Sequence, residues 1–177
     1  VTKGSASAVN ITSVRNITST VNVSGDQNLT TTIGSTALKT VDASAFTGKL
    51  NLTYASAGDL TFTGGSGNDT FTFSADNFTS ADTVDGGAGT DVLEIAGAIT
   101  AATDLKNVSN VETLKLSGTK NVTIAADANV MNFDFTSTNA NVLTLNTGVS
   151  SAVTVAVDVR VSLSASVIVS TNVSLPD

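Results

Sequence analysis

A nine-residue glycine-aspartate pattern occurs twice in the chain, over residues 64–72 and again over residues 86–94. Both copies fit Gly-Gly-x-Gly-x-Asp-x-U-x, in which U is a large apolar residue, here Phe71 and Leu93. The glycines allow the backbone to turn tightly and to direct its carbonyl oxygens toward one point. The apolar residue anchors the strand that follows. The two copies start 22 residues apart. This interval predicts a repeating structure in which equivalent turns stack on one another.

Short runs of alternating apolar and polar residues recur along the chain and predict strands with one buried face. Gly, Asn, Asp and Ser cluster between these runs as turn formers. The clearest expected strands cover residues 50–54, 60–62, 71–73, 93–95, 114–116, 122–124, 133–135, 143–145 and 153–155.

The spacing of the strands predicts how they are arranged. One series of strand-opening residues has intervals of 21, 21, 22, 21, 19 and 20, at Leu29, Leu50, Phe71, Leu93, Leu114, Phe133 and Val153. A second series lies between them, at Leu60, Val84, Leu105, Val122, Leu143 and Val161. A period of about 20 residues with two strands predicts an all-β parallel solenoid, with one strand of each coil in each of two facing sheets. An antiparallel β-sandwich, which also spaces its strands about 8–12 residues apart, is the alternative.

The two glycine-aspartate turns predict a calcium site. Calcium takes about six to eight oxygen ligands, so one loop cannot complete its shell, and we expect an ion between loops 64–69 and 86–91 stacked on adjacent coils. Asp69 and Asp91 are the strongest candidate ligands. The main chain of the two loops supplies further candidates at Gly64, Gly65, Ser66, Gly67, Gly86, Gly87, Ala88 and Gly89. Because only two copies occur, calcium is expected to be a local clamp near residues 64–94.

The other acidic residues are weaker candidates. Asp85 and Asp82 lie just before the second loop, and each is equally consistent with a solvated turn carboxylate. Four more are expected at the surface or as turn caps: Asp42, Asp59, Asp76 and Asp104.

Three segments differ in their pattern. Residues 36–150 carry both motifs and the regular spacing, so we expect them to form the two-sheet solenoid. Residues 1–35 repeat an Asn-x-Thr/Ser pattern every six residues and are expected to form N-terminal strands, with a different coil as one alternative. Residues 151–177 are expected to form C-terminal strands that either continue the coil or make another sheet. The chain opens at Val1 without Met, which predicts a mature product or a fragment.

Composition excludes several functions. The chain has no His and no Cys, so it lacks the usual general base and a thiolate nucleophile. It also lacks the Gly-x-Ser-x-Gly elbow of many hydrolases, and we do not expect an enzyme. The net charge of −7 opposes nucleic-acid binding and suits oxygen-seeking cations. No run approaches about 18 apolar residues, so no membrane span is expected.

The two nonapeptides resemble those of the RTX (repeats-in-toxin) family of bacterial proteins. The resemblance implies secretion, by the type I route in that family, and folding outside the cell when calcium binds. Segments 38–50, 81–93 and 108–116 are similar to segments of RTX-type surface-layer and large cell-surface proteins. This similarity covers about residues 36–118. The chain departs from the family in having two nonapeptides where typical members carry long arrays.

The resemblance implies a structural role. We expect a calcium-dependent module of a secreted bacterial surface layer (S-layer), a self-assembling coat on the cell surface. The implied partners are calcium ions, further copies of the protein in a lattice or oligomer, and a cell-surface glycan bound through other parts of the parent protein. The alternative is a segment of a large RTX adhesin that binds glycan or another surface ligand. Outward pairs such as Thr61/Thr63 and Thr70/Thr72 would serve such binding if they align on consecutive coils.

Overall fold

The computed structural model describes residues 9–14, 19–74, 77–96 and 105–116, and beyond these only short strands within residues 121–171. Side chains are described for residues 19–74, 77–96 and 105–116. Over the described residues the chain consists of strands and turns without a helix, which agrees with the predicted all-β class. The same residues contain no helix of the length and apolar character needed to cross a membrane.

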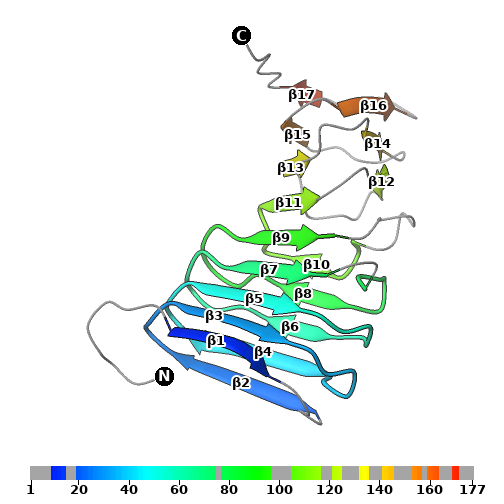
Figure 1. Ribbon diagram of the computed structural model, residues 1–177. Coiled ribbons are helices and arrows are strands. Elements are labelled where there is room, and N and C mark those ends of the chain that lie inside the picture. The colour runs from blue at the N-terminus through cyan, green and yellow to red at the C-terminus, as the bar shows by residue number, and fades with distance from the viewer. Residues whose placement is uncertain are drawn as a thin grey trace.

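Nine parallel strands form the longest sheet, which runs along the length of the molecule (Figure 1). They are the odd-numbered strands in chain order, so each pairs with the odd-numbered strand before it and after it. The strands are β1 (Val9–Val14), β3 (Leu29–Ile33), β5 (Leu50–Tyr54), β7 (Thr70–Phe73), β9 (Val92–Ile95), β11 (Thr113–Leu116), β13 (Asn132–Phe135), β15 (Val153–Ala156) and β17 (Val169–Thr171).

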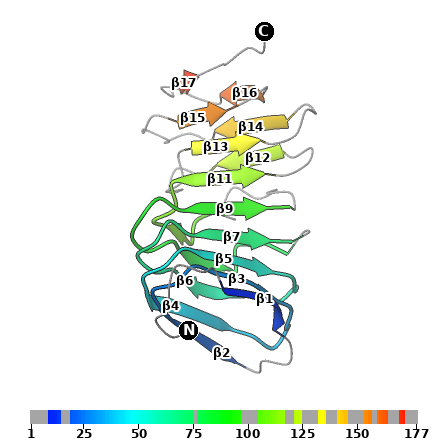
Figure 2. The same cartoon turned by 60° about the vertical axis from the view of Figure 1, so that its left-hand side comes forward.

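The even-numbered strands form two shorter sheets, which Figure 2 shows beside the N-terminal and the C-terminal part of the long sheet. The first contains β2 (Thr20–Gly25), β4 (Thr40–Phe46), β6 (Thr61–Thr63), β8 (Thr83–Asp85) and β10 (Val108–Ser109). The second contains β12 (Asn121–Ile124), β14 (Asn141–Leu145) and β16 (Val159–Leu163).

The pairing of the described strands is parallel throughout the three sheets and joins strands that are two elements apart in the chain. The antiparallel sandwich is therefore wrong, and the predicted parallel β-solenoid with two strands per coil is confirmed. We call one coil a rung. The rungs that matter below are β4–β5, β6–β7, β8–β9 and β10–β11.

The strand register confirms most of the predicted spacing of the first series. Leu29 pairs with Leu50, Phe71 with Leu93, Leu93 with Leu114, and Leu114 with Phe133. Two steps differ. Phe71 pairs with Leu52 and not with Leu50, and Phe133 pairs with Val155 and not with Val153. The first difference arises because Asp69, the acidic residue of the first nonapeptide, is the residue that lies beside Leu50 in the next rung.

The second predicted series divides between the two shorter sheets. Val122, Leu143 and Val161 pair with one another as the spacing predicts. Leu105 lies in the turn before β10, and Val108 pairs with Val84 in its place. Two sheets therefore stand where the spacing predicts one.

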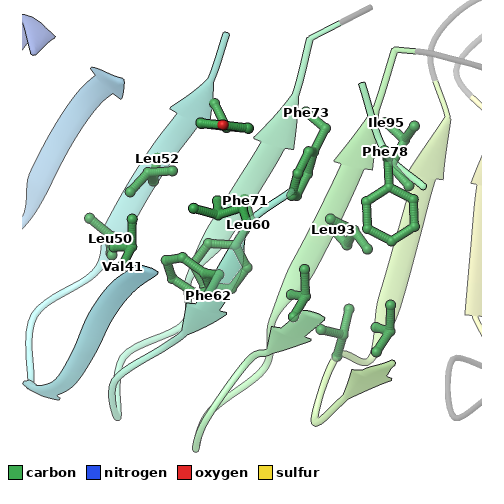
Figure 3. Close-up of a cluster of buried hydrophobic side chains, with 14 of the residues drawn as sticks. Val41, Leu50, Leu52, Leu60, Phe62, Phe71, Phe73, Phe78, Leu93 and Ile95 are labelled. Atoms are coloured by element: carbon green, nitrogen blue, oxygen red, sulfur yellow. The ribbon is translucent and has the colours of Figure 1, made fainter. Parts of the chain in front are cut away.

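The apolar core lies between the long sheet and the five-stranded sheet, as Figure 3 shows for the middle rungs. Inward and outward residues alternate along each strand; in β5, for example, Leu50, Leu52 and Tyr54 are buried. Phe62 of β6 meets Phe71 of β7 across the interior, with ring centroids 3.8 Å apart. This packing holds the two sheets together at the turns that carry the nonapeptide glycines.

Candidate metal centre

The two nonapeptide loops stack on one another at one corner of the solenoid. Loop 64–69 joins β6 to β7, and loop 86–91 joins β8 to β9. The Ala88 N–H donates to Gly65 O at 2.9 Å, and the Thr90 N–H donates to Asn68 Oδ1 at 2.9 Å. A Cβ atom on Gly87 would clash with the Gly65 carbonyl, so this close approach requires glycine. The predicted stacking of the loops on adjacent rungs is confirmed.

Asp69 is buried in the first loop, and both of its carboxylate oxygens are bound. Its Oδ1 accepts a hydrogen bond from the Leu50 N–H of the preceding rung at 2.8 Å. Its Oδ2 accepts from the Gly65 N–H of its own loop at 3.1 Å. Asp69 therefore ties loop 64–69 to rung β4–β5.

Asp91 is equally buried in the second loop but only half satisfied. Its Oδ1 accepts a hydrogen bond from the Asp69 N–H at 2.7 Å, which repeats the contact between Asp69 and Leu50 one rung later. Its Oδ2 is buried and has no hydrogen-bond partner. An anionic oxygen without a partner in the interior is strongly unfavourable, so this atom marks a position where a ligand would stabilise the protein.

The loops differ because their backbones follow different paths. In the second loop the Gly87 N–H donates to Asp85 Oδ1 at 3.1 Å and is not available to Asp91. Gly87 has φ +91° and Gly89 has φ +128°, whereas no glycine of the first loop has positive φ. Glycine with positive φ is therefore present in loop 86–91 and absent from loop 64–69. Only the second loop leaves an oxygen of its aspartate without a partner.

A third carboxylate continues the row. The register places Leu29, Leu50, Asp69, Asp91 and Glu112 at one level of successive rungs. The Asp91 N–H donates to Glu112 Oε2 at 2.6 Å. Glu112 therefore accepts from the main chain of the preceding turn in the same way as Asp91 accepts from Asp69 N–H. The nonapeptide pattern does not include Glu112, because the third turn lacks the glycines, although the residue follows Asp91 by one period.

Burial controls the ionisation of this row. It is the main cause that raises the pKa of Asp91 from 3.8 to about 6. The hydrogen bond from Asp69 N–H opposes this rise, and the negative charges of Asp69, Glu112 and Asp85 add to it. Burial also raises the pKa of Asp69, against the lowering effect of the hydrogen bonds from Leu50 and Gly65 and of the nearby Lys49 charge.

The turn above the second loop brings further oxygens to Asp91. Asn110 adopts φ 50°, and its side-chain amide donates to Asp85 Oδ1 at 2.7 Å. A Cβ atom on Gly86 would clash with Asn110 O and would lie 2.8 Å from Asp91 Oδ2. The Asn110 carbonyl and the open oxygen of Asp91 therefore flank the same point beside Gly86.

The residues of the second loop fit a calcium ion better than those of the first. The polar groups near Asp91 Oδ2 are carboxylate and carbonyl oxygens, which are the metal ligands that calcium prefers. Within the described ranges, no three acidic side chains converge in an arrangement that would hold a metal ion by themselves. Main-chain carbonyls would have to complete the shell, as the glycine-rich loops suggest. Of the two strongest predicted carboxylate ligands, Asp69 and Asp91, only Asp91 keeps an unpartnered oxygen.

The remaining candidates lie apart from this position. Asp82 is buried and not solvated: its Oδ1 accepts from Leu60 N–H at 2.8 Å and its Oδ2 from Thr79 N–H at 2.8 Å. Asp42 is partly exposed and accepts from Ser44 N–H at 3.0 Å, and Asp59 is exposed. Asp76 and Asp104 fall outside the described residues.

Comparisons with protein-family models, with curated proteins and with solved structures found no match to the chain. The interpretation of the site therefore depends on its residues and their geometry.

Proposed function

We propose that the chain is a structural, calcium-dependent module of a secreted bacterial surface-layer protein and has no enzymatic activity. In this proposal the ion binds at the nonapeptide loops and stiffens a rod that forms part of a self-assembled coat. The solenoid would supply the rigid body, and other copies of the protein would be its partners outside the cell.

One observation carries the calcium part of the proposal. The two loops stack with glycine against glycine, and the buried Asp91 of the second loop has an oxygen without a partner. A bound cation would satisfy that oxygen and neutralise part of the negative charge that the row of acids concentrates there. The coat part is supported by the similarity of residues 36–118 to RTX-type surface-layer proteins.

A calcium titration of the whole chain tests the proposal. We expect binding with a dissociation constant of about 0.1–1 mM, as in extracellular calcium modules, seen by isothermal titration calorimetry. Binding should be accompanied by a gain of β signal in circular dichroism and by sheets or filaments in electron micrographs. Asp91→Asn should abolish the response, whereas Asp59→Asn, at an exposed position, should not. A wild-type protein that shows no calcium binding by calorimetry would refute the proposal.

A binding face for glycan is the second candidate, and one row of threonines supports it. The pairs Thr61/Thr63 and Thr70/Thr72 do not continue as pairs on consecutive coils, because Thr63 lies beside Asp42 and Asp85, and Thr70 lies beside Asn51 and Val92. Thr20, Thr40, Thr61 and Thr83 pair in consecutive strands of the five-stranded sheet, so their outward hydroxyl groups align across four rungs. Such a row would match a repeating hydroxylated surface. Retention on insoluble polysaccharide that is lost in the double variant Thr40→Val/Thr61→Val would favour this candidate. Assembly without any such retention would favour the coat.

A further inference from the structure

Acidic groups surround Asp91 without a matching cation. Asp69, Asp85 and Glu112 all lie close enough to disfavour its charge. The described residues contain one ion pair, between Lys115 and Glu94 at 3.5 Å, and it lies on the outward side of the long sheet and does not involve Asp91. Buried charges of one sign are stable only when a counter-charge is present. No cationic side chain is among the groups that act on Asp91, whereas Lys49 acts on Asp69. The negative charge at Asp91 is therefore left without a counter-charge from the described side chains.

The partners of Asp91 indicate on which side that charge belongs. On the side of loop 64–69, Asp91 Oδ1 already accepts from Asp69 N–H, and both oxygens of Asp69 are bound to backbone N–H groups. On the other side, Asp91 Oδ2 has no partner. The side that faces the first nonapeptide is thus closed by hydrogen bonds, and the open oxygen lies toward Gly86 and the next turn.

The next turn, residues 110–112, supplies oxygen atoms that could bind a metal ion. Asn110 O flanks the same point beside Gly86 as Asp91 Oδ2. Glu112 reaches down to the Asp91 main chain through one oxygen, Oε2, so its carboxylate is already held at this corner. The side chain of Asn110 is fixed by Asp85, which leaves its carbonyl as the group directed at Gly86.

We infer that the calcium ion at Asp91 is held between loop 86–91 and the turn 110–112, with Asp91 Oδ2, Asn110 O and Glu112 as ligands, and not between the two nonapeptide loops. This inference rests on the proposed function, since both require calcium at the second loop. The ion joins rung β8–β9 to rung β10–β11, the point where the glycine loops end. A turn outside the repeat motif thereby completes the site.

Matched amide variants test the inference by calorimetric titration of the whole chain with calcium. Glu112→Gln keeps an acceptor for Asp91 N–H and removes the charge; we expect at least a tenfold weaker affinity. Glu94→Gln removes the same charge from the outward side of β9 and should change affinity less than threefold. Asp69→Asn should weaken affinity less than Glu112→Gln does, because Asp69 contributes negative charge near the ion but both of its oxygens are already bound to backbone N–H groups.

Manganese provides a reading that does not depend on the folding of any variant. In the ¹⁵N-labelled wild-type protein, a small amount of Mn²⁺, which prefers the same oxygen ligands, should broaden the amide signals of residues 110–113 more than those of residues 64–68. The reverse order, or loss of calcium affinity in Asp69→Asn but not in Glu112→Gln, would place the ion between the nonapeptide loops and overturn the inference alone. A wild-type chain that binds no calcium would overturn the proposed function as well.

Discussion

The main-chain N–H of Asp69 donates a 2.7 Å hydrogen bond to Oδ1 of Asp91 in the next rung. The same contact links Leu50 to Asp69 and Asp91 to Glu112, so each acid accepts from the residue at its own level one rung earlier. These carboxylates thus extend the hydrogen bonding of the parallel sheet past the ends of its strands. Their second oxygens are not equivalent, because that of Asp69 is bound and that of Asp91 is open.

Amide substitutions at these two aspartates should have opposite effects on the metal-free protein. Asp91→Asn can retain the acceptor for Asp69 N–H and removes a buried unpaired charge, so we expect the free energy of unfolding to rise by about 1–2 kcal/mol. Asp69→Asn replaces one of two needed acceptors by an NH₂ group facing a backbone N–H, which should lower it by about 1–3 kcal/mol. Urea denaturation in the presence of a calcium chelator measures both. Equal effects at the two positions would contradict the different roles assigned to their carboxylates.

The metal-free protein should be more stable in weak acid than at neutral pH. The folded-state pKa of Asp91 is raised to about 6, and those of Asp69 and Asp82 are raised in the same direction by burial. The folded state therefore binds more protons than the unfolded state between about pH 4 and pH 6, and the free energy of unfolding falls as pH rises through this window. For Asp91 the loss is at most about 3 kcal/mol. Thermal melts of the metal-stripped protein from pH 4.5 to 7.5 check this, and Asp91→Asn should flatten the profile.

Much of the fold could be predicted because repetition makes local patterns reinforce one another. Alternation in β5 places Leu50, Leu52 and Tyr54 inward, and the structure buries all three. The stacking partner of Phe71 could not be read from the spacing of strand-opening residues. It depends on where β5 begins relative to loop 64–69. In the next rung Asp69 lies beside Leu50, so Phe71 lies beside Leu52.

The candidate site was predictable only as far as the motif extends. Glycine spacing located both loops, but identical patterns do not reveal that Gly87 N–H turns to Asp85 while Gly65 N–H turns to Asp69. That difference arises from the residue before each loop, Thr63 in the first and Asp85 in the second, and from the neighbouring rung, where Asn110 lies above the second loop and donates to Asp85. Glu112 was missed for the same reason: its role follows from the register and from no local pattern.

Contact between stacked turns should make Gly65 intolerant of any side chain. A Cβ atom at Gly65 would clash with the carbonyl oxygen of Phe46 in the preceding rung, which is backbone and cannot move aside alone. Gly65→Ala should therefore lower the free energy of unfolding by more than about 3 kcal/mol or prevent folding. Gly34→Ala is the matched control, since its nearest neighbour would be Ala55 O at 3.9 Å. Denaturation midpoints of the two variants compare them, and similar losses would mean that loop 64–69 is not closely stacked on the preceding rung.

The buried hydroxyl of Thr31 should be dispensable. Thr31 lies on the inward face of β3 at 5 % exposure, and its Oγ1 has no hydrogen-bond partner. Thr31→Val keeps the branched shape that suits a strand and removes a desolvated polar atom, so we expect a gain of about 1 kcal/mol in the free energy of unfolding. Thr32→Val, on the outward face of the same strand, should change it by less than about 0.5 kcal/mol. Urea denaturation at pH 7 measures the pair. A loss of stability in Thr31→Val with none in Thr32→Val would show that the hydroxyl is bound, for example by an interior water.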